Sequence, residues 1–173
     1  MPKRIAIVGR TNVGKSSLFN RFIGRRQAIV YDQPGVTIDK LTATMRDHSF
    51  TCIDTAGFEG KIAIPDCELL IVLFDGQVGI QAGDYKLARH CQLLTLPVLY
   101  VVNKVDKEQE VRVAPFYKLG VQPLYGVSAK IGIGVNALTA VISERLGGAS
   151  QTVVSKPTIN IALVGRQNAG KSL

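Results

Sequence analysis

The sequence has few of the side chains that commonly bind transition metals, with three cysteines and two histidines among 173 residues. Cys52, Cys67 and Cys91 are odd in number and show no C-x-x-C spacing, so we expect buried, reduced thiols and no metal site built from them. His48 and His90 have no partner at ligand spacing, and we expect both at the surface. Metal chemistry based on these residue types is therefore not predicted.

Long apolar runs are absent as well. No run approaches the roughly 20 residues that a membrane-spanning helix needs, and Lys3 and Arg4 precede a strand-like run where a signal peptide would carry its apolar segment. We therefore expect a cytoplasmic protein without a membrane partner. The net charge of +8, from 21 Lys and Arg against 13 Asp and Glu, suits a polyanionic partner such as RNA. No basic stripe flanked by aromatic residues marks an RNA surface, however.

The distribution of apolar residues predicts an α/β fold. With 46% hydrophobic residues, the chain is long enough to bury one sizeable core. We expect strands at about 5–8, 41–45, 50–53, 69–74, 98–102 and 123–127, and helices at about 15–24, 81–94, 108–118 and 134–146. This alternation predicts a mostly parallel six-stranded sheet with helices on both faces.

The segment Gly9–Ser16 fits the pattern G-x-x-x-x-G-K-[ST] and follows the apolar run Ile5–Val8. A strand that enters such a loop and opens into a helix is typical of a phosphate-binding P-loop. Lys15 would place its charge on the β- and γ-phosphates, and the Ser16 hydroxyl would bind Mg²⁺. The sequence therefore predicts a nucleoside triphosphate site, and the residues expected around the phosphates are Gly9, Asn12, Val13, Gly14, Lys15, Ser16 and Ser17.

A second motif indicates which base is bound. Asn103-Lys104-Val105-Asp106 follows the apolar run Val98–Val102, and ligands of open α/β sheets bind beyond the carboxyl ends of the strands. The Asp106 carboxylate can accept from both N1–H and the 2-amino group of guanine, whereas adenine would leave it unpaired. Asn103 would tie the base to its loop, and the Lys104 stem would lie along the purine. Taken alone, the motif could equally be a polar turn.

Ser128-Ala129-Lys130 is a third and weaker element after the apolar run 123–127. The Ala129 N–H could donate to guanine O6. Without the other motifs, this tripeptide would be an ordinary loop.

Two further loops could contact the γ-phosphate. Asp54 ends a predicted strand and could hold Mg²⁺ through water, and the Gly57 N–H in the same D-x-x-G loop could contact the γ-phosphate. Thr37, in the turn-rich stretch Pro34–Thr37, is the candidate second Mg²⁺ ligand and would reach the metal only when a γ-phosphate is present. Taken alone, Pro34–Thr37 is a Pro-Gly turn.

Together these five elements resemble the Era-like GTPases, whose P-loop reads G-R-x-N-V-G-K-S. The resemblance extends from Arg4 to about Gly147 and implies a P-loop NTPase G domain with 41–45 as an antiparallel edge strand. It implies a monomeric GTP-hydrolysing switch in assembly of the large ribosomal subunit, with GTP or GDP and Mg²⁺ bound. Alternatives are the G domain of a ferrous-iron transporter, that of a tRNA-modifying GTPase, and a guanine-nucleotide-binding module without hydrolysis.

The sequence departs from many small GTPases at the position that orients the attacking water. Phe58 follows the D-x-x-G loop here, whereas many small GTPases have a Gln at this position. No arginine nearby is an evident intrinsic finger. The resemblance implies that K⁺ supplies the positive charge that an arginine finger would otherwise bring to the phosphates, and that Asn12 partly holds this K⁺. We therefore expect slow hydrolysis stimulated by K⁺, with Lys15, Thr37, Gly57 and Asn12 as the catalytic residues. Alternatively, Asn12 only caps its loop.

The end of the chain repeats its beginning. Aligning Arg4–Ser17 with Asn160–Leu173 gives 9 identities in 14 positions, including the P-loop glycines, lysine and serine. A self-repeat at one domain length predicts a second copy of the domain. We expect a first G domain over 1–147, a linker over 148–158 and the truncated start of a second G domain over 159–173, as in double-Era GTPases.

The interval between Asp54–Gly57 and the next strand is short. Only Phe58–Glu68 lies there, whereas the resemblance implies a full helix. Either this helix is shortened, or residues are missing from the sequence.

Overall fold

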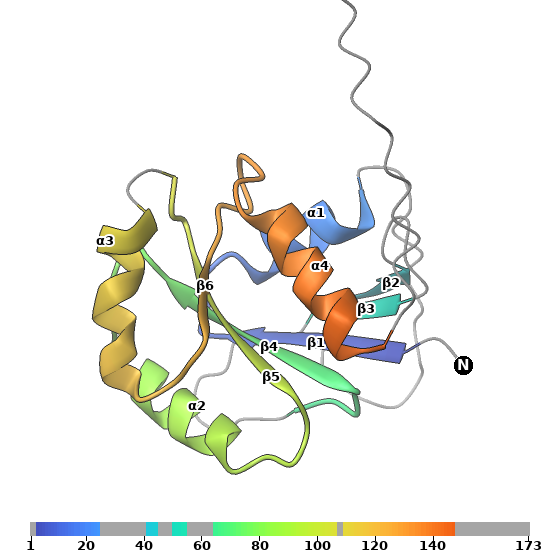
Figure 1. The fold of residues 1–173 in the computed structure, drawn as a ribbon, viewed down its shortest axis with the longest axis horizontal. Coiled ribbons are helices and arrows are strands. Elements are labelled where there is room, and N and C mark those ends of the chain that lie inside the picture. The colour runs from blue at the N-terminus through green and yellow to red at the C-terminus, as the bar shows by residue number, and fades with distance from the viewer. Residues whose placement is uncertain (1–2, 25–40, 45–49, 55–63, 107–108, 148–173) are drawn as a thin grey trace, which may run out of the picture.

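Six strands form one sheet in the order β2-β3-β1-β4-β5-β6 (Figure 1). Their bounds are β1 Lys3–Gly9, β2 Leu41–Thr44, β3 Phe50–Asp54, β4 Leu69–Asp75, β5 Val98–Asn103 and β6 Leu124–Gly126. Neighbouring strands run parallel except β2 and β3, which pair antiparallel at one edge. The prediction of a mostly parallel six-stranded sheet with an antiparallel edge is confirmed.

This structure is a computed structural model that describes residues 3–24, 41–44, 50–54, 64–106 and 109–147. The predicted linker, the start of a second domain, Thr37, His48, Gly57 and Phe58 lie outside the described residues. Within the described part, no helix is long and apolar enough to cross a membrane.

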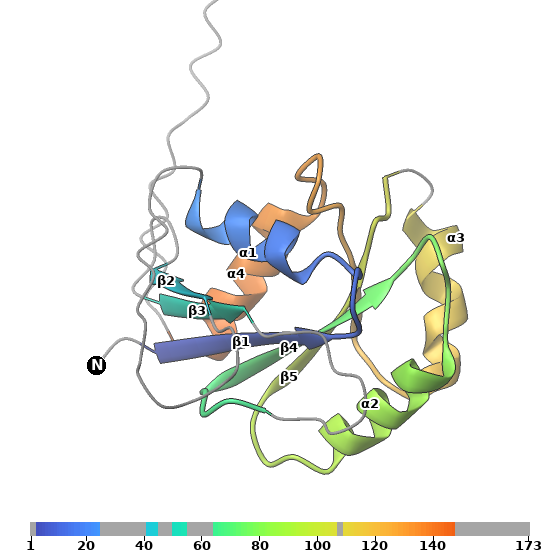
Figure 2. The same ribbon diagram turned by 180° about the vertical axis from the view of Figure 1, so that it is seen from behind.

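Helices cover both faces of the sheet. Their bounds are α1 Lys15–Ile23, α2 Ala82–Gln92, α3 Gln109–Val113, the 3₁₀-helix η1 Ala114–Leu119 and α4 Val135–Arg145. Helices α1 and α4 lie side by side on one face, and α2 and α3 lie on the other, as both views show (Figures 1 and 2). This is the two-faced arrangement that the alternating sequence predicts.

The two faces follow from the period of two along a strand. In β1, Ile5 and Ile7 belong to the core under α1 and α4, whereas Ala6 and Val8 belong to the core under α2 and η1. All seven residues of β4 are buried because this strand lies in the middle of the sheet. A continuous apolar run is therefore the expected pattern for a central parallel strand.

The expected helix over 108–118 is divided in the structure. Gln109–Val113 is α-helical, and Ala114–Leu119 is a 3₁₀-helix with Pro115 in its first turn. Proline has no backbone N–H and disfavours the α conformation of the residue before it, which ends the α-helical hydrogen-bond pattern here. Apolar spacing alone does not register this change.

The cysteines are placed largely as predicted. Cys52 and Cys91 are buried, and Cys67 is half-buried. Burial raises the pKa of the Cys91 thiol to about 12 and also raises that of Cys67. His90 is exposed on α2, also as expected.

Candidate functional site

A pocket of about 320 Å³ lies beyond the carboxyl ends of the parallel strands, where β1 runs into the loop before α1. The residues that line it are Asn12, Gly14, Lys15, Ser16, Ser17 and Lys104. Five of them come from the predicted phosphate loop and the sixth from the predicted base motif. The fold therefore brings together two segments that are about 90 residues apart in sequence.

The Lys15 side chain is folded onto its own loop. It is 7% exposed, and its Nζ donates to the backbone carbonyls of Gly9 at 3.2 Å and Arg10 at 2.8 Å. A buried ammonium needs such acceptors, and a bound phosphate would supply stronger ones. The loop thus holds a buried cation at the start of helix α1, whose dipole also favours an anion.

Asn103 links the two predicted motifs. It is 2% exposed, its Nδ2 donates to the Val13 carbonyl at 2.9 Å, and its Oδ1 accepts from the Ala129 N–H at 3.0 Å. Gly14 makes room for it, because a Cβ at this position would lie 2.2 Å from Asn103 Nδ2. Gly14 also has a φ of 96°, which other residues rarely adopt.

The loop after β6 is held from two sides. Besides the bond from Ala129 to Asn103, Arg21 of α1 donates through Nε to the Ala129 carbonyl at 3.0 Å and through Nη2 to the Lys130 carbonyl at 2.5 Å. The Ala129 N–H, expected on guanine O6, thus donates within the protein here, and a base would share this donor or replace its acceptor.

The Asp106 carboxylate is oriented by Ser128. The Ser128 hydroxyl donates to Asp106 Oδ1 at 2.6 Å, and Ser128 itself is fully buried. A short charge-assisted hydrogen bond of this kind fixes the plane of the carboxylate. Asp106, Asn103 and Ala129 therefore form one connected group at the end of β5.

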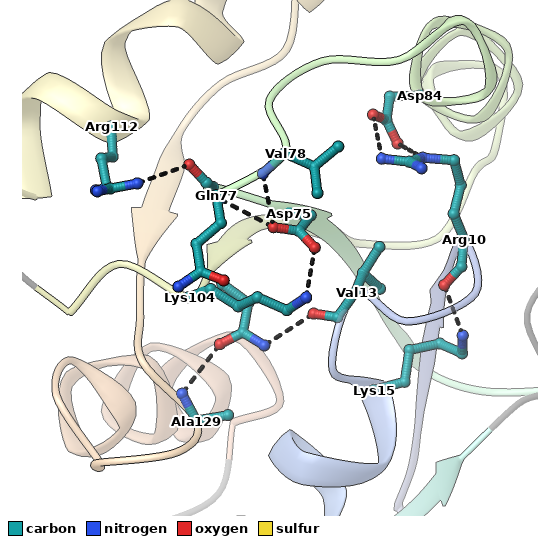
Figure 3. Close-up of polar contacts among 12 residues, drawn as sticks. Arg10, Val13, Lys15, Asp75, Gln77, Val78, Asp84, Lys104, Arg112 and Ala129 are labelled. Atoms are coloured by element: carbon teal, nitrogen blue, oxygen red, sulfur yellow. Dashed lines mark hydrogen bonds and ion pairs between the residues drawn. The ribbon is translucent and has the colours of Figure 1, made fainter.

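Lys104 has a partner that the sequence did not indicate. Its Nζ lies 2.5 Å from Oδ2 of Asp75, the last residue of β4, and Asp75 is 3% exposed (Figure 3). Burial alone would raise the pKa of Asp75, but hydrogen bonds from Lys104 and from the N–H groups of Val78 and Gln77 outweigh it and lower that pKa below 3.8. Asp75 thus stays charged and neutralises the ammonium beside the pocket.

A second ion pair anchors the phosphate loop. Arg10 turns away from the pocket, and its Nε and Nη2 lie 2.8 and 3.1 Å from the two carboxylate oxygens of Asp84 on α2 (Figure 3). Asp84 is fully buried. The ion pair connects the loop to the helix on the opposite face of the sheet from α1.

The metal side of the site is described only in part. Ser16 lies in the pocket beside Lys15, and Asp54 ends β3, which pairs with the β1 strand that leads into the loop. Among the described residues, no group of three or more His, Cys, Asp or Glu could hold a metal. The Ser16 hydroxyl is an oxygen donor of the kind that Mg²⁺ takes together with phosphate oxygens. Its place in the pocket therefore fits a Mg²⁺–nucleotide complex.

Strand order, phosphate loop and base motif together define a P-loop G domain. The chain belongs to the family of 50S ribosome-binding GTPases, whose model matches residues 4–104. It is similar to GTPase Der of Geobacter metallireducens, with 40% identity over 97% of the chain and 42% of the relative, and to GTPase Der of Geotalea daltonii, with 38% identity over 99% of the chain and 43% of the relative. The chain thus spans less than half the length of these curated relatives.

Solved structures agree on the fold. Aquifex aeolicus Era, solved with GDP and AlF₄⁻, is 21% identical, with a TM-score of 0.66 over 83% of this chain and 56% of that one. The G domain of the T. maritima FeoB iron transporter is 26% identical, with a TM-score of 0.63 over 83% of this chain and 98% of that one.

The alignment with the Geobacter relative spans 185 positions, more than the 173 residues here, so that relative has residues that this chain lacks.

Proposed function

We propose that this chain binds guanine nucleotides, hydrolyses GTP and acts as a switch in assembly of the large ribosomal subunit. The observation that carries the proposal is the buried Asn103, which joins the phosphate loop to the loop containing Ala129. Asp106, held by Ser128, lies in the same group. A single ligand with phosphates at one end and a guanine at the other matches these two linked loops.

In this proposal the phosphate loop binds the β- and γ-phosphates. Lys15 leaves the carbonyls of Gly9 and Arg10 and donates to phosphate oxygens, while the loop N–H groups surround them. Mg²⁺, held by Ser16 and by Thr37 and Asp54, would neutralise charge on these oxygens. The Gly57 N–H would contact the γ-phosphate. In this proposal, GTP binding and hydrolysis act by changing which partner the protein binds.

The base specificity is tested by Asp106→Asn. Xanthine has a carbonyl where guanine has its 2-amino group, so an amide side chain can donate to xanthine and accept from its N1–H. We expect preference for GDP over XDP to shift towards XDP by roughly a hundredfold, from two hydrogen bonds of about 1–2 kcal/mol each. Competition against a fluorescent nucleotide measures this, with Asp66→Asn at an exposed position as control. Equal binding of ADP and GDP by the unaltered chain would refute guanine specificity.

We also propose K⁺-stimulated hydrolysis through Asn12. This residue lines the pocket, is exposed, and has a φ of 62°, a conformation that asparagine tolerates. Its side chain would hold K⁺ beside the bridging oxygen and offset developing charge. Phosphate release should be faster in KCl than in NaCl, and Asn12→Ala should remove the difference while GDP still binds. Equal rates in both salts contradict this role.

The ribosomal role is supported by the matched family, which is described as 50S ribosome-binding GTPases. The iron-transport alternative has support from the fold, but the FeoB G domain is less similar in sequence than the Der relatives.

We further propose that residues 159–173 begin a second G domain, on the basis of the repeat. Co-sedimentation of the two-domain protein with large ribosomal subunits, stronger with a GTP analogue than with GDP, is the expected result. Identical sedimentation in both states would argue against a switch.

A further inference from the structure

The side chain of Arg10 is committed to α2 and not to the pocket. Its guanidinium makes two bonds to Asp84, at 2.8 and 3.1 Å, and the close-up shows it pointing away from Lys15 (Figure 3). The geometry is bidentate, which is the strongest and most directional form of an Arg–carboxylate pair. An arginine held in this way is not available to a phosphate.

The partner carboxylate is itself fixed. Asp84 is fully buried in the first turn of α2, where its Oδ2 accepts from the Gln81 N–H at 2.8 Å as part of a capping box. A buried carboxylate needs a cationic partner, because an unpaired charge in the protein interior is strongly destabilising. The contact is also close-fitting, since a Cβ on Gly83 would lie 2.9 Å from Arg10 Cδ.

The anchor lies next to the cation that would bind phosphate. The Arg10 carbonyl accepts from Lys15 Nζ at 2.8 Å, so the residue that pairs with Asp84 also directs the lysine. At the other end of the loop, the Val13 carbonyl accepts from Asn103 at 2.9 Å. The loop is thus fastened at its first half to α2 and at its second half to β5.

We propose that Arg10 and Asp84 are positioning residues that hold the phosphate loop in its binding conformation, with Gly83 making room for the contact. This inference rests on the proposed nucleotide-binding function. It assigns the pair to the phosphate half of the ligand and excludes Arg10 as a source of charge on the γ-phosphate. Disturbing the pair weakens phosphate binding and leaves base selection unchanged.

The test uses the 173-residue chain with Arg10→Met, Arg10→Lys and Asp84→Asn. Competition against a fluorescent nucleotide gives affinities for GDP, GMP and XDP. In Arg10→Met and Asp84→Asn we expect the ratio of GDP to GMP affinity to fall about tenfold, as expected for the loss of charge-assisted hydrogen bonds. The preference for GDP over XDP stays constant, and Arg10→Lys restores part of the loss. Arg4→Met, which breaks the exposed ion pair with Asp66, is the control and leaves both ratios unchanged.

Three outcomes overturn the inference. An unchanged GDP-to-GMP ratio in both Arg10→Met and Asp84→Asn refutes it while the proposed function stands, because the unaltered chain still binds GDP. A loss of hydrolysis of a thousandfold or more with unchanged GDP affinity would mean that Arg10 acts on the transferring phosphate as a finger does. If the unaltered chain binds no GDP, the proposed function and the inference both fail. Asp84→Asn keeps an acceptor for Gln81, so should Arg10→Met not fold, an unchanged ratio in Asp84→Asn alone refutes the inference.

Discussion

Two basic side chains near the site, Lys104 and Arg10, are each paired with a buried carboxylate. Asp75 pairs with Lys104 and Asp84 pairs with Arg10, and both acids are almost completely buried. These pairs keep basic side chains in fixed directions near the pocket while their carboxylates face the protein interior. Removing one member of a buried pair is costly because the other is left without compensation.

The Asp75 pair predicts a pH-dependent stability. Its lowered pKa means that the charged carboxylate stabilises the fold fully above about pH 3.8 and that this contribution is lost as the pH falls through the lower folded-state value. Asp75→Asn should therefore reduce the free energy of unfolding by about 1–3 kcal/mol at pH 7. The difference from the unaltered chain should shrink at pH 3. Urea unfolding at both values measures it, and a difference independent of pH would contradict the assignment.

At the scale of elements, two connections join the ends of the strands into a site. Asn103 at the end of β5 holds the loop before α1 and the loop before α4, and Arg21 of α1 holds the latter a second time. The elements themselves pack by apolar contact. Their loops are fixed by polar side chains from neighbouring elements.

Gly14→Ala tests how closely two of these loops approach. The alanine would have to adopt a strained positive φ, and its Cβ would lie 2.2 Å from Asn103 Nδ2. We therefore expect a loss of more than about 2 kcal/mol in the free energy of unfolding and weaker GDP binding. Gly79→Ala is the matched control, because Gly79 also has a positive φ of 79° but nothing lies within 4 Å of its Cβ. Equal losses in the two variants would show that strain alone, and not the contact with Asn103, matters.

The elements could be predicted from sequence much better than the contacts between their side chains. Apolar runs located the parallel strands, because both faces of a parallel sheet are covered. The edge strand β2 was expected at 41–45 and is found at Leu41–Thr44. Residues of the phosphate loop and of the base motif line one pocket, and their roles towards phosphate and guanine stay predictions. The Arg10–Asp84 and Lys104–Asp75 pairs were missed, because their members are 74 and 29 positions apart and no local pattern relates them. Asp75, directly after the apolar run 69–74, was the only sign in the sequence of a charged partner for Lys104.

At the scale of the whole molecule, the described residues form two cores separated by the sheet. The core between the sheet and helices α1 and α4 contains Phe19 and Ile142. The core between the sheet and α2 and η1 contains Phe74 and Phe116, whose stacked rings have centroids 5.7 Å apart. Cys52 belongs to the first core and Cys91 to the second. Thiol reactivity therefore reports on each side of the sheet separately.

Alkylation at pH 8 should be slow in the folded chain. Cys52 and Cys91 are inaccessible, and burial raises the pKa of Cys91 to about 12, so almost no thiolate forms there. Cys67 is half-buried with a raised pKa and should react first, though more slowly than a free thiol. Mass spectrometry of iodoacetamide adducts, with and without guanidinium chloride, distinguishes the three. Rapid native labelling of Cys91 would contradict the second core.

Strand β4 has neighbours on both edges and helices over both faces. Its backbone amide protons can therefore exchange with deuterated solvent only when the sheet itself comes apart, not through fraying at an edge. The slowest-exchanging protons of this strand would measure the free energy of complete unfolding, whatever happens in the loops that surround the ligand.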